Sequence, residues 1–299
     1  MALTINHNMM SMTTARLLTD SYGKLANSTR RLSSGLRIQT AADDAAGLAV
    51  REIMRSEIKS LQQGIRNAND AISMIQTADG ALGVIDEKLI RMKELAMQAS
   101  TGTYSSDQRL IIDSEYQAMA SEITRIANST DFNGIHLLNG NLSGTNSTHN
   151  GAALKATGPM KVHFGTGNDS SEDYYYISID NSTASALGVG LGATGATNGK
   201  SISTQQLAQT ALDSLNNAII SKDKIRANLG SMQNRLQNTI TNLSIQAENT
   251  QAAESLVSDV DVATEMTEFT RQQILTQSAV AMLSQANGLG RLAMQLIGG

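Results

Sequence analysis

The sequence predicts a mainly α-helical protein, in which long antiparallel helical rods of the coiled-coil type carry a small β-hairpin region and the two termini pair as helices. Near both ends apolar residues recur at alternating spacings of three and four, the pattern of a seam that packs against another helix. The 299 residues include one proline, so long helices can run uninterrupted. Aromatic residues make up only 3%, which suits thin helix–helix seams better than a large globular core.

Each end of the chain is predicted to contribute one amphipathic segment to a shared terminal domain. The first segment covers residues 1–42 and the second covers residues 259–299. Because a seam at a chain end has no core of its own to enter, we expect it to pack against the other end or against a neighbouring chain. The residues of this self-assembly seam are Leu18, Leu25, Leu32, Leu36, Leu275, Met282, Leu289 and Leu296.

A long rod helix is predicted after the first terminal segment. Asp43 or Asp44 can cap its first turn, where a carboxylate accepts backbone N–H groups and opposes the helix dipole. The apolar seam continues to Ala99, and a slip of its register near Ala78 is interpreted as a stammer inside one continuous helix. At ~1.5 Å per residue this run extends roughly 85 Å, which exceeds the thickness of a globular core.

A second, shorter helix and a polar stretch follow the rod. Residues 101–103 contain a glycine flanked by threonines and interrupt the helical pattern, which resumes over 106–128. Residues 131–134 have the composition of a turn. Residues 139–157 are small and polar, and we expect them to form an exposed loop.

The remainder of the chain predicts a hairpin, a loop and the returning rod helix. Two β-favouring runs, 160–164 and 174–179, flank a stretch rich in Gly, Asn and Asp, as in a β-hairpin. Ser203 with Gln206 offers a capping box for the returning helix. The predicted division of the chain between its terminal segments is 43–180 for the first part of the rod domain with its hairpin, 181–202 for a surface loop and 203–258 for the returning rod helix.

Composition and motifs give little support for enzymatic chemistry. The net charge of −4 and the pI near 5.6 argue against nucleic-acid binding, and no apolar run is long enough for membrane insertion. Cysteine is absent, and the four histidines are scattered without a metal-ligand or nucleophile pattern. We therefore predict no enzyme activity, no cofactor and no metal. The N-terminus lacks the basic and apolar regions of a cleavable signal peptide, so if the protein leaves the cell, we expect it to use another route.

Several blocks of residues make the chain similar to a known family. They are Asn27–Ile38 with Ala41–Ala49, Asp131–Gly134, Ile225–Leu236 with Ile240–Leu243, and Asp261–Glu265 with Gln273–Leu275 and Gln285–Asn287. In this order and at these places the blocks resemble bacterial flagellin. The resemblance covers nearly all of residues 1–140 and 205–299.

The resemblance implies an extracellular subunit of the flagellar filament that serves swimming motility. It implies that residues 1–42 and 259–299 are the two halves of an inner-tube domain, which order when they dock on identical neighbours. The implied partners are further copies of the chain, an export chaperone, and cap and junction proteins, with passage through the flagellar type III apparatus. Only residues 140–200 separate the two matching regions, so we expect no additional outer domain.

The family resemblance also implies candidate recognition residues. A segment around Arg91 resembles the one that vertebrate Toll-like receptor 5 binds, which makes Arg91, Leu95 and Glu115 the expected receptor contacts; the alternative is that these are ordinary seam and surface residues. Flagellins carry O-linked modifications at surface Ser and Thr, which makes the serines of three Asn-X-Ser or Asn-Ser-Thr stretches candidate glycosylation sites. These serines are Ser143, Ser147 and Ser182.

Three other interpretations remain open at this stage. A hook–filament junction protein shares flagellin-like ends and comparable length, but it would not polymerise alone. An adhesin-like module would use the hairpin region as its ligand site and would have ordered ends as a monomer. An enzyme in the middle of the chain is the least favoured, because some sixty polar residues without a core cannot readily build an active site.

Overall fold

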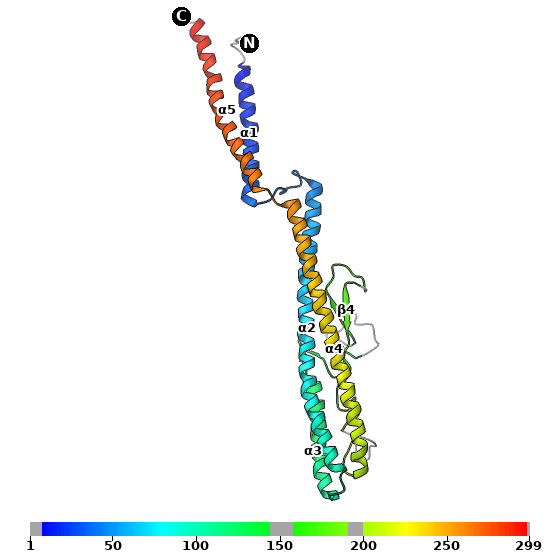
Figure 1. Ribbon diagram of the computed structural model, residues 1–299. Helices are drawn as coiled ribbons and strands as arrows, with labels where there is room; N and C mark the ends of the chain where they lie inside the picture. Colours follow the sequence, from blue (N-terminus) through cyan, green and yellow to red (C-terminus); the bar gives the residue numbers. More distant parts are fainter. Residues whose placement is uncertain (1–7, 144–157, 171, 191–199, 298–299) are drawn as a thin grey trace. The chain divides into compact units, whose positions relative to one another are not determined.

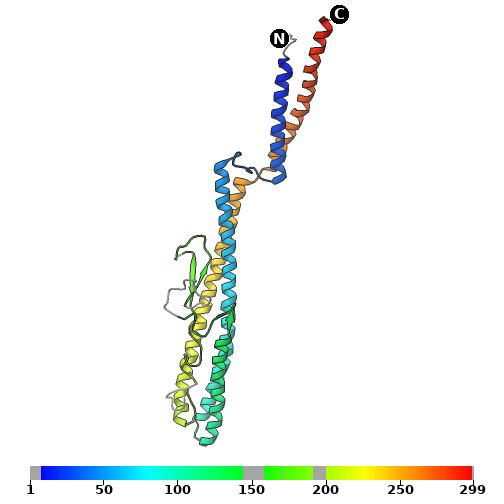
Figure 2. The same cartoon turned by 180° about the vertical axis from the view of Figure 1, so that it is seen from behind.

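A computed structural model describes residues 8–143, 158–170, 172–190 and 200–297, with the side chains from 289 onward outside the description. Over these residues the protein is mainly α-helical, with two small antiparallel sheets, and the predicted fold class is confirmed. It consists of two compact units (Figures 1 and 2). The first comprises residues 1–58 and 248–299, and the second residues 59–247.

The first unit is built around two terminal helices that lie side by side, α1 (Met9–Ser34) and α5 (Val262–Ile297). Asn8 caps α1, because its side-chain oxygen accepts a hydrogen bond from the Ser11 amide at 3.0 Å. Gly35 ends α1 in the left-handed conformation, at φ 73°, and its amide donates to Arg31 O at 2.9 Å. The sequence therefore defines both ends of this helix.

The second unit contains the helices α2 (Ala45–Ser100), α3 (Ser106–Ser129) and α4 (Gln205–Ser258), of which α2 and α4 also enter the first unit. Within the second unit α2 and α4 run antiparallel. The predicted stammer near Ala78 is wrong, because buried residues continue through it at an unbroken spacing of seven. One such series on α2 is Leu61, Ala68, Ile75, Leu82, Leu89 and Ala96, and a parallel series is Ala71, Ala78, Ile85, Met92 and Ala99.

The starts of the helices follow local capping chemistry, with one correction. Ser105 and Gln108 form a capping box at the start of α3. At the start of α4 the cap is Thr204, whose hydroxyl accepts from the Leu207 amide at 3.3 Å. The predicted cap at Ser203 is therefore one residue too early. Ser203 and Thr204 both carry a hydroxyl that can cap a helix, so the sequence alone does not choose between them.

Two small hairpins are present in the second unit. The first pairs β1 (Asp131–Phe132) with β2 (Ile135–His136). The second pairs β3 (Met160–His163) with β4 (Tyr174–Ile177), in the region where the hairpin was predicted. The Asn67 side chain of α2 donates to His163 O at 2.8 Å, which fastens β3 to the rod.

The segment that joins this hairpin to α4 is not simply a surface loop. Among its described residues Ser182, Ala184 and Val189 are completely buried, and Ile202 just before α4 is buried as well. Leu142 is also buried, although it falls in the stretch that was predicted to be exposed. Single apolar residues in a polar stretch leave no periodic signal, so their burial depends on the tertiary fold. The rest of that stretch, 144–157, lies outside the described residues.

Candidate assembly and recognition surfaces

The terminal helices meet along a seam of mostly small and polar side chains. Their antiparallel order is fixed by Asn8, which donates to Ala286 O at 2.9 Å, and by Arg31, which lies 3.7 Å from Glu265 at the other end. The less exposed positions again follow spacings of three and four. On α1 they are Ser11, Thr14, Leu18, Ser21, Leu25, Ser28 and Leu32; on α5 they are Glu265, Phe269, Gln272, Thr276, Ala279, Leu283 and Ala286.

The predicted self-assembly seam coincides with this contact on α1 but not on α5. Leu18, Leu25 and Leu32 are half-buried in the seam, and half-buried Leu36 forms an isolated β-bridge with Asp259. In contrast, Leu275 and Met282 are 47% and 51% exposed, because the seam passes one residue later on α5, through Thr276 and Leu283. Leu275 and Met282 therefore do not face the partner helix of the same chain, and their contact with a neighbouring copy stays a prediction. Leu289 and Leu296 have side chains outside the described part.

The outward faces of the two terminal helices are unusually apolar. Among their described residues only Ser28, Gln272, Thr276 and Ala286 are buried, so the contact encloses no large apolar side chain completely. The exposed large apolar residues are Met9, Met10, Met12, Leu17 and Tyr22 on α1, and Val262, Met266, Ile274, Leu275, Val280 and Met282 on α5. An apolar surface of this kind marks a contact with other protein.

The two connections to the rod helices hydrogen-bond to each other inside the first unit. The Arg37 amide donates to Ser258 O at 2.7 Å, and the Val260 amide donates to Gly35 O at 3.0 Å. The Arg37 guanidinium also donates to Val257 O at 2.7 Å. The chain therefore leaves α1 and enters α5 through a short antiparallel pairing of backbone.

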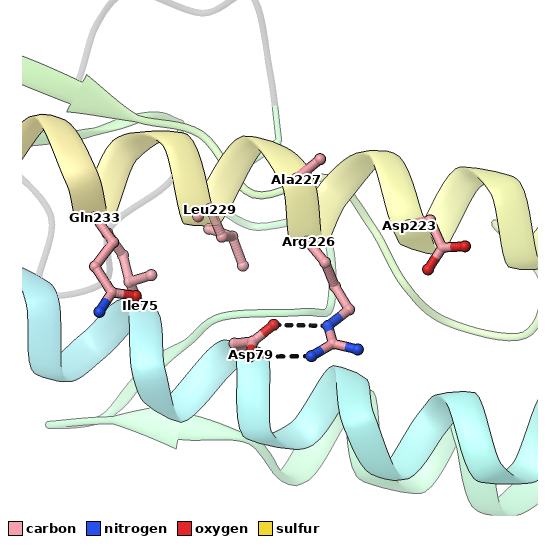
Figure 3. A pocket seen from close by; sticks show the side chains of 8 residues that line it. Ile75, Asp79, Asp223, Arg226, Ala227, Leu229 and Gln233 are labelled. Carbon is pink, nitrogen blue, oxygen red and sulfur yellow. Dashed lines mark hydrogen bonds and ion pairs between the residues drawn. The ribbon is translucent and has the colours of Figure 1, made fainter.

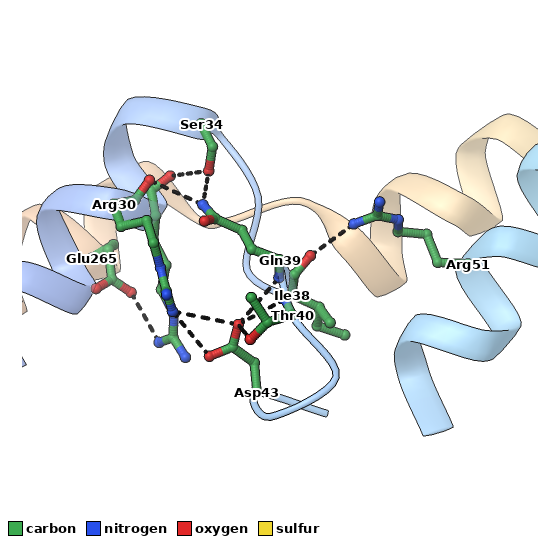
Figure 4. A network of polar contacts seen from close by, with 9 residues as sticks. Arg30, Ser34, Ile38, Gln39, Thr40, Asp43, Arg51 and Glu265 are labelled. Atoms are coloured by element: carbon green, nitrogen blue, oxygen red, sulfur yellow. Dashed lines mark hydrogen bonds and ion pairs between the residues drawn. The ribbon is translucent and has the colours of Figure 1, made fainter. Parts of the chain in front are cut away.

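Asp43 organises the loop before α2 (Figure 4). Its carboxylate accepts from the backbone and the hydroxyl of Thr40, both at 3.0 Å, and from the Gln39 amide at 3.3 Å, and it pairs with Arg30 at 3.2 Å. These hydrogen bonds, led by the Thr40 amide, lower the pKa of Asp43. Asp44 instead caps α2, because its carboxylate accepts from the Gly47 amide at 3.0 Å. Of the two carboxylates considered from sequence, Asp44 is thus the helix cap.

The loop is also held from the side of α2. The Arg51 side chain, although charged, is largely buried and donates to Ile38 O at 2.7 Å. The Gln39 side chain donates to Arg30 O at 3.0 Å and hydrogen-bonds to the Ser34 hydroxyl. A buried arginine and an amide side chain give no sequence pattern, so sequence analysis missed both contacts.

The expected receptor residues separate into two groups. Arg91 on α2 donates two hydrogen bonds to Glu115 on α3, at 3.0 and 2.9 Å, and one to Glu94 at 2.9 Å. Arg91 and Glu115 are accessible, and the carboxylates, Glu94 first, raise the pKa of the arginine. Leu95 is only 2% exposed, because it belongs to the core of the second unit. The expectation that Leu95 contacts a receptor is wrong for this conformation.

The candidate glycosylation sites also differ in accessibility. Ser182 is completely buried, and its amide donates to Leu138 O at 2.9 Å, so the prediction of a modified Ser182 is wrong. Ser143 is half-buried and its hydroxyl donates to Gly140 O at 2.9 Å. Ser147 lies outside the described residues.

A membrane-spanning segment is not found among the helices that the structure describes, since none of them combines the required length and apolar character.

Comparisons with known proteins agree with this architecture. The family described as "Bacterial flagellin N-terminal helical region" matches residues 5–143, and "Bacterial flagellin C-terminal helical region" matches residues 204–297. Flagellin FlaB2 of Treponema pallidum is 38% identical over 293 residues, which is 98% of this chain and 99% of that protein. The flagellin of Bacillus subtilis is 38% identical over 309 residues, again 98% and 99% of the two chains.

A further relative and a solved structure were also compared. The flagellar filament 33 kDa core protein of Treponema phagedenis is 40% identical over 294 residues, covering 98% of this chain and 99% of that protein. The crystal structure of Bacillus cereus flagellin shares 30% identity and covers 63% of this chain and 94% of that one, with a TM-score of 0.46.

Paired terminal helices with apolar outer faces, joined to antiparallel rod helices, define a class of structural subunits that polymerise. The chain belongs to the bacterial flagellin family. It is therefore a structural subunit of the extracellular flagellar filament and not an enzyme.

Proposed function

We propose that this chain enters the filament by folding its two terminal helices against those of neighbouring copies. The observation that carries the proposal is the distribution of apolar side chains on α1 and α5. The seam between the two helices contains Ser28, Gln272 and Thr276, whereas large apolar residues such as Met12 and Leu275 are exposed. Burial of these outer residues against other copies supplies the free energy that the intramolecular seam lacks.

The physical consequence is a coupling between folding and polymerisation. An isolated pair of helices with little buried apolar area cannot offset the conformational entropy that it loses on folding. Docking on an identical neighbour buries the outer faces and orders the helices in the same step. A head-to-tail contact between identical subunits that does not close into a ring propagates as a helical polymer, without a cofactor or nucleotide.

The same surface bears on domain roles and export. We assign residues 1–42 and 259–299 to the inner tube of the filament and residues 43–180 with 203–258 to the surrounding rod layer. A chain with apolar ends needs those ends covered before assembly, which supports passage through the flagellar type III apparatus with an export chaperone. Cap and junction proteins at the filament ends would meet the same apolar faces.

Seeded polymerisation tests the proposal. Monomer is added to short sonicated filament fragments at neutral pH, and elongation is followed by negative-stain electron microscopy. We expect long filaments from the full chain and none from a chain that lacks residues 262–299. The variant Leu275→Ser with Met282→Ser should elongate at least tenfold more slowly, whereas the matched variant Gln277→Ser with Gln285→Ser changes polar exposed positions and should elongate normally.

Two results would contradict this mechanism. Filaments from the truncated chain would mean that the terminal helices are dispensable. A monomer whose terminal amides are fully protected from hydrogen exchange before assembly would mean that folding precedes docking.

The Arg91–Glu115 pair supports a second role, recognition of the monomer by Toll-like receptor 5. The supporting observation is that this accessible ion pair joins α2 to α3 and so presents a charged, rigid surface. Arg91→Ala with Glu115→Ala should lower receptor signalling in a reporter-cell titration. The matched variant Glu122→Ala with Arg125→Ala removes another accessible pair on α3 and should leave the dose response unchanged. Equal curves for the two double variants would reject this role.

A further inference from the structure

We propose that Lys222 determines the register in which α4 packs against α2. Lys222 is 2% exposed, and its position belongs to a buried series of α4 with a spacing of seven residues. The other members of the series are all apolar: Ala208, Leu215, Leu229, Leu236 and Leu243. A single lysine in an otherwise apolar heptad position is a known means of selecting one register of a coiled coil.

Two ion pairs connect the helices at this place. The Lys222 ammonium lies 2.5 Å from the Asp86 carboxylate of α2 and 2.7 Å from Asp223 of its own helix. One turn away, the Arg226 guanidinium crosses from α4 to Asp79 of α2 with hydrogen bonds of 2.7 and 3.2 Å (Figure 3). The second pair borders a groove of about 380 Å³ between the helices. Each of these two cations of α4 therefore faces a carboxylate of α2.

The apolar residues alone do not distinguish this register from its neighbours. Both helices carry buried apolar residues at a spacing of seven, so a slip of one heptad again places apolar residues opposite apolar residues. Among the apolar residues of this helix pair, only size differences between Ala, Leu, Ile and Met then oppose the slip. Charge must therefore supply most of the discrimination between registers.

The two possible slips by one heptad have different electrostatic consequences. In one direction Lys222 moves from Asp86 to Lys93, so a buried ammonium meets a like charge, while Arg226 moves onto Asp86 and remains paired. In the other direction Lys222 meets Asp79 and remains paired, but Arg226 moves onto Ile72. The observed register is the one in which both cations are paired. The first slip is therefore opposed by the buried lysine, because Arg226 keeps a carboxylate partner in it. The second slip is opposed by the lost pair of the partly exposed Arg226.

Another contact also restrains α4, and the test must separate it from the lysine. The Asp113 carboxylate of α3 accepts from the Ile202 amide at 2.7 Å, three residues before α4 begins. This contact holds the entry of α4, whereas Lys222 acts within the helix pair. The two restraints are separable because they share no residue.

Distance measurement by electron paramagnetic resonance tests the proposal in the full chain. The sequence contains no cysteine, so Ser60→Cys and Asn228→Cys, both exposed, attach two nitroxide labels at defined places. A slip of one heptad changes their separation by ~10 Å, since each residue rises ~1.5 Å. The labels are introduced into five chains: the otherwise unchanged protein, Lys222→Met, Asp113→Ala, Lys222→Met with Asp113→Ala, and the matched control Lys224→Met, which changes an exposed lysine two residues away.

We expect one distance in the unchanged chain, in Asp113→Ala and in Lys224→Met. The chain with both Lys222→Met and Asp113→Ala should show a second population, longer by ~10 Å, that makes up at least a tenth of the molecules. A single unchanged distance in that chain would overturn the proposal. A second population in Asp113→Ala alone would also overturn it, because the loop contact would then set the register. Loss of helix in Lys222→Met, measured by circular dichroism, would equally contradict it, since the lysine would then be required for folding instead of for register.

Discussion

The docking of the β3–β4 hairpin on α2 depends on the absence of a side chain at Gly64. A Cβ atom at this position would lie 2.0 Å from Phe164 O and 2.8 Å from Phe164 C, which are backbone atoms that cannot rotate away. The Gly64→Ala protein must therefore move the end of β3 away from α2 by roughly 1 Å, given that carbon and oxygen need about 3 Å or more. This displacement also strains the hydrogen bond from Asn67 to His163 O, which is 2.8 Å long.

The expected magnitude is a balance of opposing effects. Overpacking of this kind costs about 1–3 kcal/mol, and a weakened hydrogen bond adds about 1 kcal/mol. Alanine within a helix recovers about 1 kcal/mol relative to glycine. We therefore expect Gly64→Ala to lower the free energy of unfolding of the second unit by about 1–3 kcal/mol, with the largest rise in hydrogen exchange at the amides of β3 and β4.

Gly80→Ala is the matched control, because Gly80 lies in the same helix and a Cβ there meets no atom within 4 Å. This variant should raise the free energy of unfolding by about 0.4–1 kcal/mol. Urea unfolding followed by circular dichroism compares the two, and hydrogen exchange locates the change. If Gly64→Ala stabilises the protein as much as Gly80→Ala does, the steric argument for hairpin docking is refuted.

Contacts of three other residues can be tested by substitution. Asp43→Ala should speed hydrogen exchange in the loop before α2. In the unchanged protein this loop should be fully stable above pH ~4 and loosen as the pH falls through the lowered pKa of Asp43. The control Asp44→Asn keeps a capping oxygen and should not change exchange in the loop, so equal exchange in both variants would disprove the assignment. Burial, with a smaller contribution from Asp113, raises the pKa of the Tyr116 hydroxyl well above its usual range. The contribution of Tyr116 to the free energy of unfolding should therefore be complete below pH ~10 and fall at higher pH. Tyr116→Phe should lose this alkaline dependence, as measured by urea unfolding at several pH values. Gly190→Ala should destabilise the second unit, since the φ of Gly190 is 59° and a Cβ there would lie 2.1 Å from Ala120 Cβ. Adding Ala120→Gly removes the clash and should restore only part of the lost free energy of unfolding. Full restoration would show that the backbone conformation carries no cost.

Local features of the chain were predictable from sequence because they depend on neighbouring residues. The near absence of proline and the apolar spacings of three and four predict the long helices. The capping box at Ser105 and the turn at Asp131–Gly134 could equally be located from adjacent residues, although sequence analysis recognised only the turn. Predictions that required knowledge of a distant surface were less successful. Ser182 and Leu95 were expected at the surface, and both are buried in the second unit.

The seam on α5 is the clearest case in which the sequence does not decide which helix face contacts α1. Spacings of three and four are satisfied by the series through Leu275 and Met282 and equally by the neighbouring series through Thr276 and Leu283. The sequence left open whether the more apolar series packs against the other end of the chain or against a neighbouring copy. The structure pairs the more polar series with α1 and leaves Leu275 and Met282 exposed.

The sequence by itself therefore determined that this protein consists of long helices with seams, that its ends are amphipathic, and that it resembles the flagellin family. The tertiary structure decided which face of each helix is covered within the chain, which charges are buried, and that Lys222 pairs with Asp86. The physical reason is that helix formation and capping depend on residues a few positions apart, whereas burial depends on the surface that another segment brings to the same place.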